Sequence, residues 1–177
     1  MNSLNKSTVS YARAAVGKLD SSMDQRASLR SNSQRQEQTN PPRKDIFTQD
    51  TMVLVVEDNV SNFVLIARML GYMGIHCEWK TSGYEVVEYA DTLPRLDLIL
   101  MDIRLPYEDG FTALQKIRAT PKLKKTLVVA VTAEANLEHM KKARQFGFDG
   151  FIGKPLDMDR FPDQIRRILN GEPVWEL

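Results

Sequence analysis

Residues 53–58 read VLVVED, a run of four apolar residues that ends in two carboxylates. Apolar residues that do not alternate with polar ones predict a strand covered on both faces, which is the usual environment of a strand in a parallel sheet. Four further strand-like runs come later in the chain, at residues 75–79, 98–101, 127–131 and 151–152.

The segments between these strands carry apolar residues at helical spacing. In the first of them, Val60, Phe63, Val64, Ala67 and Leu70 form one stripe, and similar stripes recur in each later segment. Strands that alternate with helices imply parallel pairing through right-handed crossovers, with helices on both faces of the sheet. We therefore predict a five-stranded, doubly wound parallel α/β domain.

The first 50 residues differ in composition from the rest. No apolar side chain occurs between residues 30 and 45, so this stretch cannot bury enough surface to offset the entropy lost on ordering. We expect a disordered polar tail at residues 1–50, an ordered domain at residues 51–171 and a short tail at residues 172–177. Because Met52 directly precedes the first strand, a mis-start of the reading frame upstream of it is a second explanation of the long tail.

Charge, cysteine content and hydropathy exclude several classes of protein. The chain has 24 Lys and Arg against 23 Asp and Glu, a formal net charge of +1, which gives no global reason for binding DNA or an anionic membrane. A single cysteine excludes a disulfide framework and a Cys-rich zinc site, and it suits a reducing cytoplasm. No apolar run exceeds five residues, whereas a membrane helix needs about 20.

Residues whose side chains can react or bind a ligand follow four of the five predicted strands. They are Glu57 and Asp58 after the first strand, Asp102 after the third, Thr132 after the fourth and Lys154 after the fifth. Because ligands of open parallel sheets bind beyond the carboxyl ends of the strands, we expect these side chains to gather at one edge. Taken singly, Asp58 or Asn59 could instead cap the first helix, Thr132 could cap the fourth, and Lys154 could be a solvated charge.

Taken together, these residues favour a metal and phosphoryl site. Three carboxylates in one cleft repel one another, and a hard cation such as Mg²⁺ resolves that conflict. A metal ion beside a carboxylate, a lysine and a hydroxyl group is suited to neutralise and hold the oxygens of a phosphoryl group.

The chain resembles the receiver domain of two-component response regulators over residues 52–170. The matching segments are VVEDN at 55–59, LILMD at 98–102, LP at 105–106, DG at 109–110, VTA at 131–133 and GKP at 153–155. The spacings also fit the family: 44 residues from Asp58 to Asp102, 30 from there to Thr132 and 22 more to Lys154. Each segment alone is a weak signal, but all of them in register are specific. The resemblance implies a flavodoxin-like, CheY-like fold with strand order 2-1-3-4-5.

The resemblance also implies a reaction. Asp102 is the implied phosphoacceptor, taking a phosphoryl group from a phosphohistidine of a sensor histidine kinase or a histidine phosphotransfer protein. Mg²⁺ is the implied cofactor, held by the side chains of Glu57, Asp58 and Asp102 and by the backbone carbonyl of Arg104. Such a protein assists its own phosphorylation and dephosphorylation but is not expected to be a separate enzyme.

The resemblance further implies a conformational switch. Thr132 and Lys154 would contact the phosphoryl group, and the peptide bond from Lys154 to Pro155 would be cis. As Thr132 closes onto the group it would draw Phe151 inward, changing a surface made of the fourth helix, fifth strand and fifth helix. A downstream protein target would bind that surface. Formation of a homodimer on phosphorylation is left open.

Three departures from the commonest receiver pattern stand out. Phe151 occupies a position where Tyr is frequent, so the packing change would occur without a hydroxyl group. Arg104 and Glu134 each follow a site residue by two positions; we hypothesise that they pair over the phosphoryl group and slow its hydrolysis. Two separately solvated side chains are the alternative, because exposed ion pairs contribute little.

To Trp79, at the end of the second strand, we assign no chemistry.

Asn62, together with the lack of a further domain after residue 171, favours a single-domain response regulator with an N-terminal extension. Three other functions compete with this interpretation. A DNA-binding regulator acting through the tail is disfavoured, because a net charge of +3 over residues 1–50 is too dilute for a phosphate footprint. A phosphorylation-independent adaptor would not need an intact acidic pocket. A phosphatase with an aspartyl nucleophile would carry that nucleophile after the first strand, whereas Asp102 follows the third.

Overall fold

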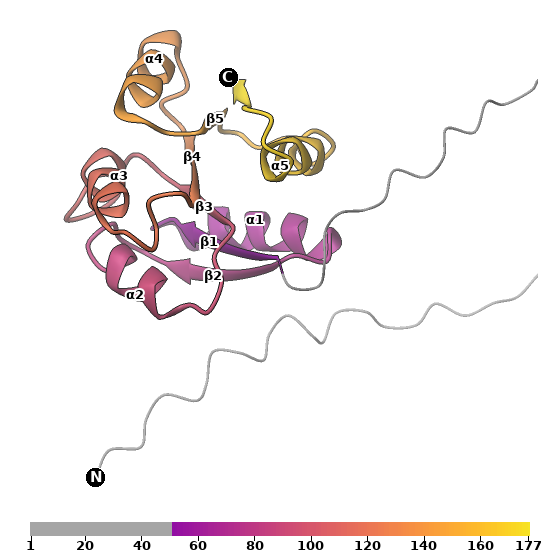
Figure 1. Cartoon of the computed structure of the whole chain (residues 1–177). Coiled ribbons are helices and arrows are strands. Elements are labelled where there is room, and N and C mark those ends of the chain that lie inside the picture. Colours follow the sequence, from indigo (N-terminus) through magenta and orange to yellow (C-terminus); the bar gives the residue numbers. More distant parts are fainter. Residues whose placement is uncertain (1–50) are drawn as a thin grey trace, which may run out of the picture. The chain divides into compact units, whose positions relative to one another are not determined.

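The computed structural model describes residues 51–177, which form a parallel sheet covered by helices on both faces (Figure 1). In this part of the chain the elements are β1 (Met52–Val56), α1 (Val60–Tyr72), β2 (His76–Lys80), α2 (Val86–Thr92), β3 (Leu98–Met101), α3 (Gly110–Ala119), β4 (Leu127–Thr132), α4 (Leu137–Phe146), β5 (Gly150–Gly153), α5 (Phe161–Leu169) and β6 (Trp175–Glu176). The strand order is β2-β1-β3-β4-β5-β6, and every pair of neighbours is parallel.

The sheet confirms the predicted doubly wound fold and the order of its five main strands. The residues of β1 from Val53 to Val56 are fully buried, as a strand covered on both faces requires. Strand β6 is an addition, since the sequence predicts only a short tail at residues 172–177. It pairs with the outer edge of β5 over two residues, which is too short a run to show strand periodicity.

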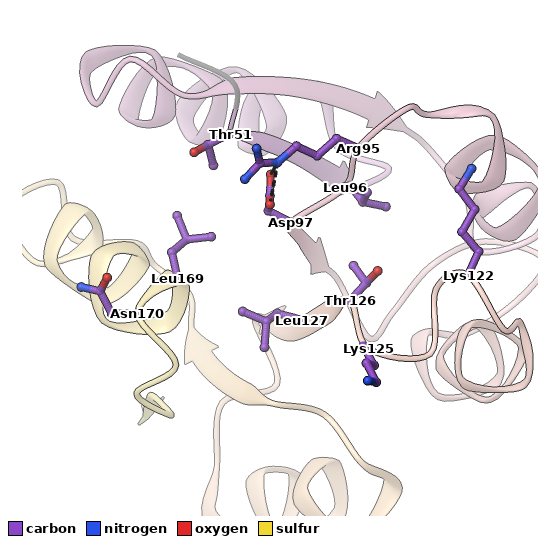
Figure 2. A pocket seen from close by; sticks show the side chains of 10 residues that line it. All are labelled: Thr51, Arg95, Leu96, Asp97, Lys122, Lys125, Thr126, Leu127, Leu169 and Asn170. Atoms are coloured by element: carbon purple, nitrogen blue, oxygen red, sulfur yellow. Dashed lines mark hydrogen bonds and ion pairs between the residues drawn. The ribbon is translucent and has the colours of Figure 1, made fainter. Parts of the chain in front are cut away.

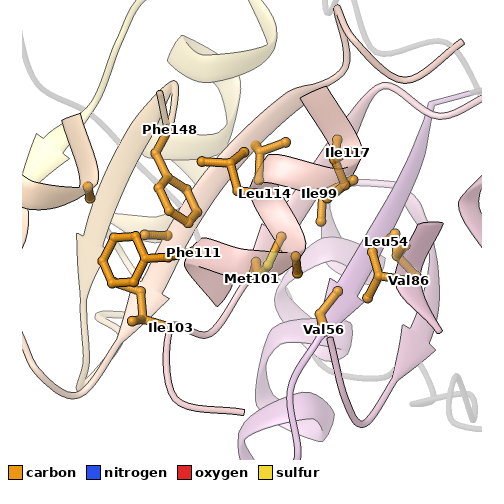
Figure 3. Close-up of a cluster of buried hydrophobic side chains, with 14 of the residues drawn as sticks. Leu54, Val56, Val86, Ile99, Met101, Ile103, Phe111, Leu114, Ile117 and Phe148 are labelled. Carbon is orange, nitrogen blue, oxygen red and sulfur yellow. The ribbon is translucent and has the colours of Figure 1, made fainter. Parts of the chain in front are cut away.

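One core layer lies between the sheet and helices α2, α3 and α4. Figure 3 shows its centre, where Phe111 and Leu114 of α3 pack against Met101 of β3 and Phe148. The rings of Phe111 and Phe148 meet edge to face with centroids 5.8 Å apart, a favourable arrangement for aromatic pairs.

The second core layer lies under helices α1 and α5. In α1 the buried residues are Ile66, Met69 and Leu70, whereas Val60 and Val64 are 59% and 41% exposed. The stripe predicted from Val60 to Leu70 is therefore wrong at Val60 and Val64. The face of α1 that packs on the sheet runs through Phe63, Ile66 and Met69. At 3.6 residues per turn, Val60 and Val64 lie on another side of the helix.

The predictions of a disordered tail and of an upstream mis-start concern residues 1–50, which lie outside the described residues. Within residues 51–177, no helix is long and apolar enough to cross a membrane.

Candidate functional site

The predicted site residues lie at the carboxyl ends of the strands, as the fold requires. Asp102 follows β3, Thr132 ends β4, and Lys154 follows β5. A buried triad connects three of them: the Lys154 ammonium nitrogen lies 2.5 Å from Glu57 Oε2 and 2.5 Å from Asp102 Oδ2. The side chains of Lys154, Glu57 and Asp102 are only 10%, 2% and 9% exposed. One ammonium group thus neutralises two carboxylates that would otherwise repel each other.

The same contacts act on the pKa of Lys154. Burial alone lowers the pKa of an ammonium group, but here the hydrogen bonds and charges of Asp102 and Glu57 outweigh it and raise the pKa above the ordinary value. Lys154 is therefore a fixed positive charge at neutral pH. This makes it suitable for holding anionic oxygens at the same position.

Glu57 is positioned by residues that the sequence did not single out for this task. Asn62, one turn into α1, donates its side-chain amide to Glu57 Oε1 at 2.9 Å. The indole of Trp79 donates to the Glu57 carbonyl at 2.8 Å and stacks on Phe63 with ring centroids 4.4 Å apart. Trp79, to which the sequence assigns no chemistry, thus fixes the backbone that carries the carboxylate.

Asp102 is held on both carboxylate oxygens. Its Oδ2 accepts from Lys154, and its Oδ1 accepts from the backbone N–H of Arg104 at 3.0 Å. The backbone behind it is crowded, because a Cβ atom added to Gly110 would lie 2.6 Å from the Asp102 carbonyl oxygen. Glycine at position 110 therefore lets the start of α3 approach the loop that carries the acid.

The simple capping alternatives do not account for Asp58 and Thr132. Asn59 caps α1 by accepting from the backbone N–H groups of Ser61 and Asn62, and Asn136 caps α4. Asp58 is exposed. Thr132 is buried, and its hydroxyl accepts a long hydrogen bond of 3.3 Å from the Glu134 N–H, so its own proton is available to an incoming group.

The three carboxylates are chemically suited to bind a hard cation. Glu57, Asp58 and Asp102 offer only oxygen donors, which is the preference of Mg²⁺. Among residues 51–177, no three His, Cys, Asp or Glu side chains are already grouped closely enough to hold a metal ion. In the triad, the Lys154 ammonium group stands between two of the carboxylates.

Arg104 and Glu134 form an ion pair beside the pocket. The hydrogen bond and charge of Glu134 raise the pKa of Arg104, and those of Arg104 lower the pKa of Glu134. His139 Nε2 lies 3.5 Å from the other Glu134 oxygen.

The Lys154–Pro155 peptide bond is cis, and Phe151 is fully buried in β5.

A second pocket opens at the opposite edge of the sheet, where the strands begin. Figure 2 shows it, a cavity of about 500 Å³. Its lining includes Arg95, Lys122 and Lys125, and Arg95 is already paired with Asp97. It contains none of the predicted site residues.

Fold and site together define a class: a doubly wound α/β domain with a lysine-bridged acidic pocket beyond its strand ends. The family model for the response regulator receiver domain matches residues 53–166. The chain belongs to this family of two-component signalling domains.

Several known proteins are similar to it. The histidine-protein kinase BarA of Escherichia coli is 36% identical over 122 residues, which cover 69% of this chain and 13% of BarA. Hybrid signal transduction histidine kinase G of Dictyostelium discoideum is 37% identical over 131 residues, 72% of this chain and 4% of that kinase. The matched region is thus a small part of each kinase.

Among solved structures, the receiver domain of sensor histidine kinase PA1611 from Pseudomonas aeruginosa has a TM-score of 0.62 and 31% identity; the match covers 69% of this chain and 98% of that domain. That structure has a magnesium ion coordinated in its active-site cleft.

Proposed function

We propose that Asp102 accepts a phosphoryl group from a phosphohistidine of a sensor histidine kinase or a histidine phosphotransfer protein. The observation that carries this proposal is the buried triad, in which one lysine holds the carboxylates of Asp102 and Glu57 at 2.5 Å each. In the reaction, a carboxylate oxygen of Asp102 bonds to phosphorus and the phosphorus–nitrogen bond breaks. The electron pair of that bond stays on the leaving imidazole, and Asp102 becomes an acyl phosphate.

The residues around Asp102 serve positioning and charge neutralisation, which dominate catalysis of phosphoryl transfer. The Arg104 N–H fixes one carboxylate oxygen, so the nucleophile is oriented before the donor arrives. Lys154 is close enough to contact a phosphoryl oxygen in place of its present contact with Asp102. The Thr132 hydroxyl, which now only accepts a long hydrogen bond, would donate to another phosphoryl oxygen.

The cofactor that fits this pocket is Mg²⁺. Glu57, Asp58, Asp102 and the backbone carbonyl of Arg104 would hold it. When bound, it supplies positive charge to the oxygens of the phosphoryl group. Binding would require Lys154 to give up part of its contact with the carboxylates, so lysine and metal compete for the same two side chains.

The signal would leave through the surface of α4, β5 and α5. Thr132 ends β4 and Phe151 lies on the adjacent strand β5, in register with Ala130. A shift of Thr132 towards the phosphoryl group would leave space for the Phe151 ring to move. A downstream protein would bind the changed surface. In this proposal the domain is a phosphorylated switch and not a separate enzyme.

Incubation with Mg²⁺ and acetyl phosphate tests the acceptor. We expect the intact mass of the wild-type chain to increase by one phosphoryl group and that of Asp102→Asn to stay unchanged, because the amide is not a comparable nucleophile. Asp109→Asn, at the cap of α3 outside the triad, is the matched control and should still be modified. A folded wild-type protein without any adduct would reject the proposal and favour the phosphorylation-independent adaptor.

The ion pair of Arg104 and Glu134 is expected to slow hydrolysis of the acyl phosphate by obstructing the approach of water. Because both groups are at the surface, the effect should be modest. We expect Arg104→Ala to lose the phosphoryl group about two- to fivefold faster than wild type, as measured by the decay of the mass adduct. Arg95→Ala removes a comparable pair at the opposite edge and should not change the rate. Equal rates for Arg104→Ala and wild type would reject this role.

A further inference from the structure

Helix α4 begins at a cap in which a histidine side chain takes part. The side-chain oxygen of Asn136 accepts the His139 N–H at 2.8 Å, and the side-chain nitrogen of Asn136 lies 2.9 Å from His139 Nδ1. Because the amide oxygen is already engaged by the backbone, the amide nitrogen is the atom that meets the ring. Asn136 is therefore the donor in this second contact, and Nδ1 of the neutral imidazole is the acceptor.

The hydrogen bond from Asn136 determines which ring nitrogen carries the proton. With Nδ1 as an acceptor, the proton of the neutral ring is on Nε2. Nε2 lies 3.5 Å from Glu134 Oε2, so the positive side of the imidazole is next to the carboxylate. A separation of 3.5 Å is long for a hydrogen bond, but it is within the range of an ion pair when the ring is protonated.

Glu134 stands between two nitrogen-containing side chains. Its Oε1 pairs with Arg104, and its Oε2 faces His139. The backbone N–H of Glu134 donates to the Thr132 hydroxyl, so this residue also contacts the end of β4. The side chain of His139 is 31% exposed, whereas that of Arg104 is 75% exposed. Of the two partners of Glu134, the histidine is thus the one more enclosed by the protein.

These three side chains line a cavity of about 310 Å³ beside the loop that follows Asp102. Its apolar lining includes Ile103 and Phe111, which Figure 3 shows in the core layer under α3. The other charged groups of the lining are Asp109, which caps α3, and Lys142 of α4. Their charges are opposite and add little net charge. Glu134 is the acid within ion-pair distance of the imidazole.

Protonation of His139 acts on the ring through both nitrogens. Nδ1 becomes a donor and can no longer accept from the Asn136 amide. Nε2 then carries positive charge opposite the carboxylate of Glu134, which attracts it. The two nitrogens point in nearly opposite directions, so both effects move the ring away from Asn136 and towards Glu134. The carboxylate is then held at both of its oxygens.

We propose that His139 is a positioning residue for Glu134: it holds the carboxylate against Arg104, so that this pair obstructs water, and it does so most strongly when protonated. As the pH rises and the ring loses its proton, the hold weakens and the acyl phosphate at Asp102 hydrolyses faster. Through Asn136, the start of α4 is thereby connected to the lifetime of the phosphoryl group. This inference rests on the proposed phosphorylation of Asp102 and on the proposed role of the Arg104–Glu134 pair.

The decay of the mass adduct of the full-length chain, followed at about pH 6 and about pH 8, tests the proposal, because histidine ordinarily changes its charge in this range. His139→Gln can still accept from Asn136 but cannot become charged. The lifetime of the wild-type adduct divided by that of this variant should be about two- to threefold larger at the lower pH, the modest effect expected of a partly exposed ion pair. Taking the ratio removes the effect of pH on the acyl phosphate itself. An equal ratio at both pH values would overturn the proposal.

His76→Gln is the matched control. The chain has two histidines, and His76 is exposed at the start of β2, at the opposite edge of the sheet. The lifetime of its adduct relative to wild type should be the same at both pH values. A pH-dependent ratio for this variant as well would mean that the effect does not belong to His139.

A double-mutant cycle tests whether His139 acts through the Arg104–Glu134 pair. His139→Ala should shorten the lifetime of the adduct at least about twofold at about pH 6. In the Arg104→Ala background the same change should have no further effect, because no pair remains to be held. A merely structural role of His139 in α4 would shorten the lifetime equally in both backgrounds, and that result would contradict the proposal.

A measurement on the unphosphorylated chain separates this inference from the proposed function. Nitrogen-15 NMR at about pH 8 should show the neutral His139 ring with its proton on Nε2. A proton on Nδ1 would reject the orientation by Asn136, whether or not Asp102 accepts a phosphoryl group. A chain without any adduct would reject phosphorylation and, with it, the role of His139. A normal adduct whose decay does not respond to His139 would reject only the role of His139.

Discussion

Replacing Lys154 by methionine is expected to slow phosphorylation of Asp102 by acetyl phosphate about a hundredfold, the usual cost of removing one charge-stabilising donor from an active site. Methionine keeps much of the side-chain volume but removes the ammonium group that lies 2.5 Å from both Glu57 and Asp102. The incoming phosphoryl oxygens would then meet two carboxylates without their counter-charge.

The same substitution should have the opposite effect on Mg²⁺. In the proposed site, lysine and metal would compete for Glu57 and Asp102, so loss of the ammonium group should raise Mg²⁺ affinity at least about tenfold. Trp79 can report the binding, because its indole is hydrogen-bonded to the Glu57 carbonyl. A titration followed by Trp79 fluorescence in a Trp175→Phe background gives the dissociation constant.

Lys141→Met is the matched control, since it removes an exposed lysine of α4. It should change neither the phosphorylation rate nor the affinity for Mg²⁺. If Lys154→Met lowered both phosphorylation and Mg²⁺ affinity, the lysine would be supporting the metal site instead of competing with it, and our description of the pocket would be wrong.

The largest expected loss of stability follows from Phe151→Ala. Phe151 is fully buried in β5 and belongs to the core layer beneath α3 and α4. Removing a buried phenyl ring costs about 3–5 kcal/mol of unfolding free energy, from lost burial and from the cavity that remains. Because domains of this size are stable by only about 5–15 kcal/mol, a shift of this size should be plain in urea denaturation.

Tyr72→Ala is the comparison for this measurement. Tyr72 ends α1 and is 84% exposed, so its removal should change the unfolding free energy by less than about 0.5 kcal/mol. Similar losses for both variants would show that the Phe151 ring does not lie in the core. The Phe151→Ala chain can also be tested for phosphorylation at Asp102, which separates the stability of β5 from the chemistry of the pocket.

Most of the sheet was predictable from the sequence, because its central strands β1, β3 and β4 are continuous apolar runs. In β3 all four residues from Leu98 to Met101 are buried, as expected of a strand that is covered on both faces. The site residues were predictable for a related reason. Each lies at or just after the end of a strand, and parallel strands bring their carboxyl ends to the same edge.

The face of α1 that packs on the sheet could not be predicted from apolar spacing alone. The helix carries apolar residues on more than one side, and the spacing does not say which side meets the sheet. Val60 and Val64 are exposed, while Ile66 and Met69 are buried. The position of β6 could not be predicted either. A strand of two residues carries no periodic signal, and its partners lie in other elements, β5 and α5.

The sequence by itself therefore determined the sheet and the group of acids, hydroxyl and lysine at one edge, since these depend on apolar runs and on the residues at their carboxyl ends. The order of the main strands followed from the resemblance to receiver domains. Only the tertiary structure decided which groups touch. It placed Lys154 between Glu57 and Asp102, brought Asn62 and Trp79 to Glu57, and laid Glu176 against α5. Such contacts join residues from separate elements, and their geometry depends on how helices pack on the sheet, which local sequence patterns do not contain.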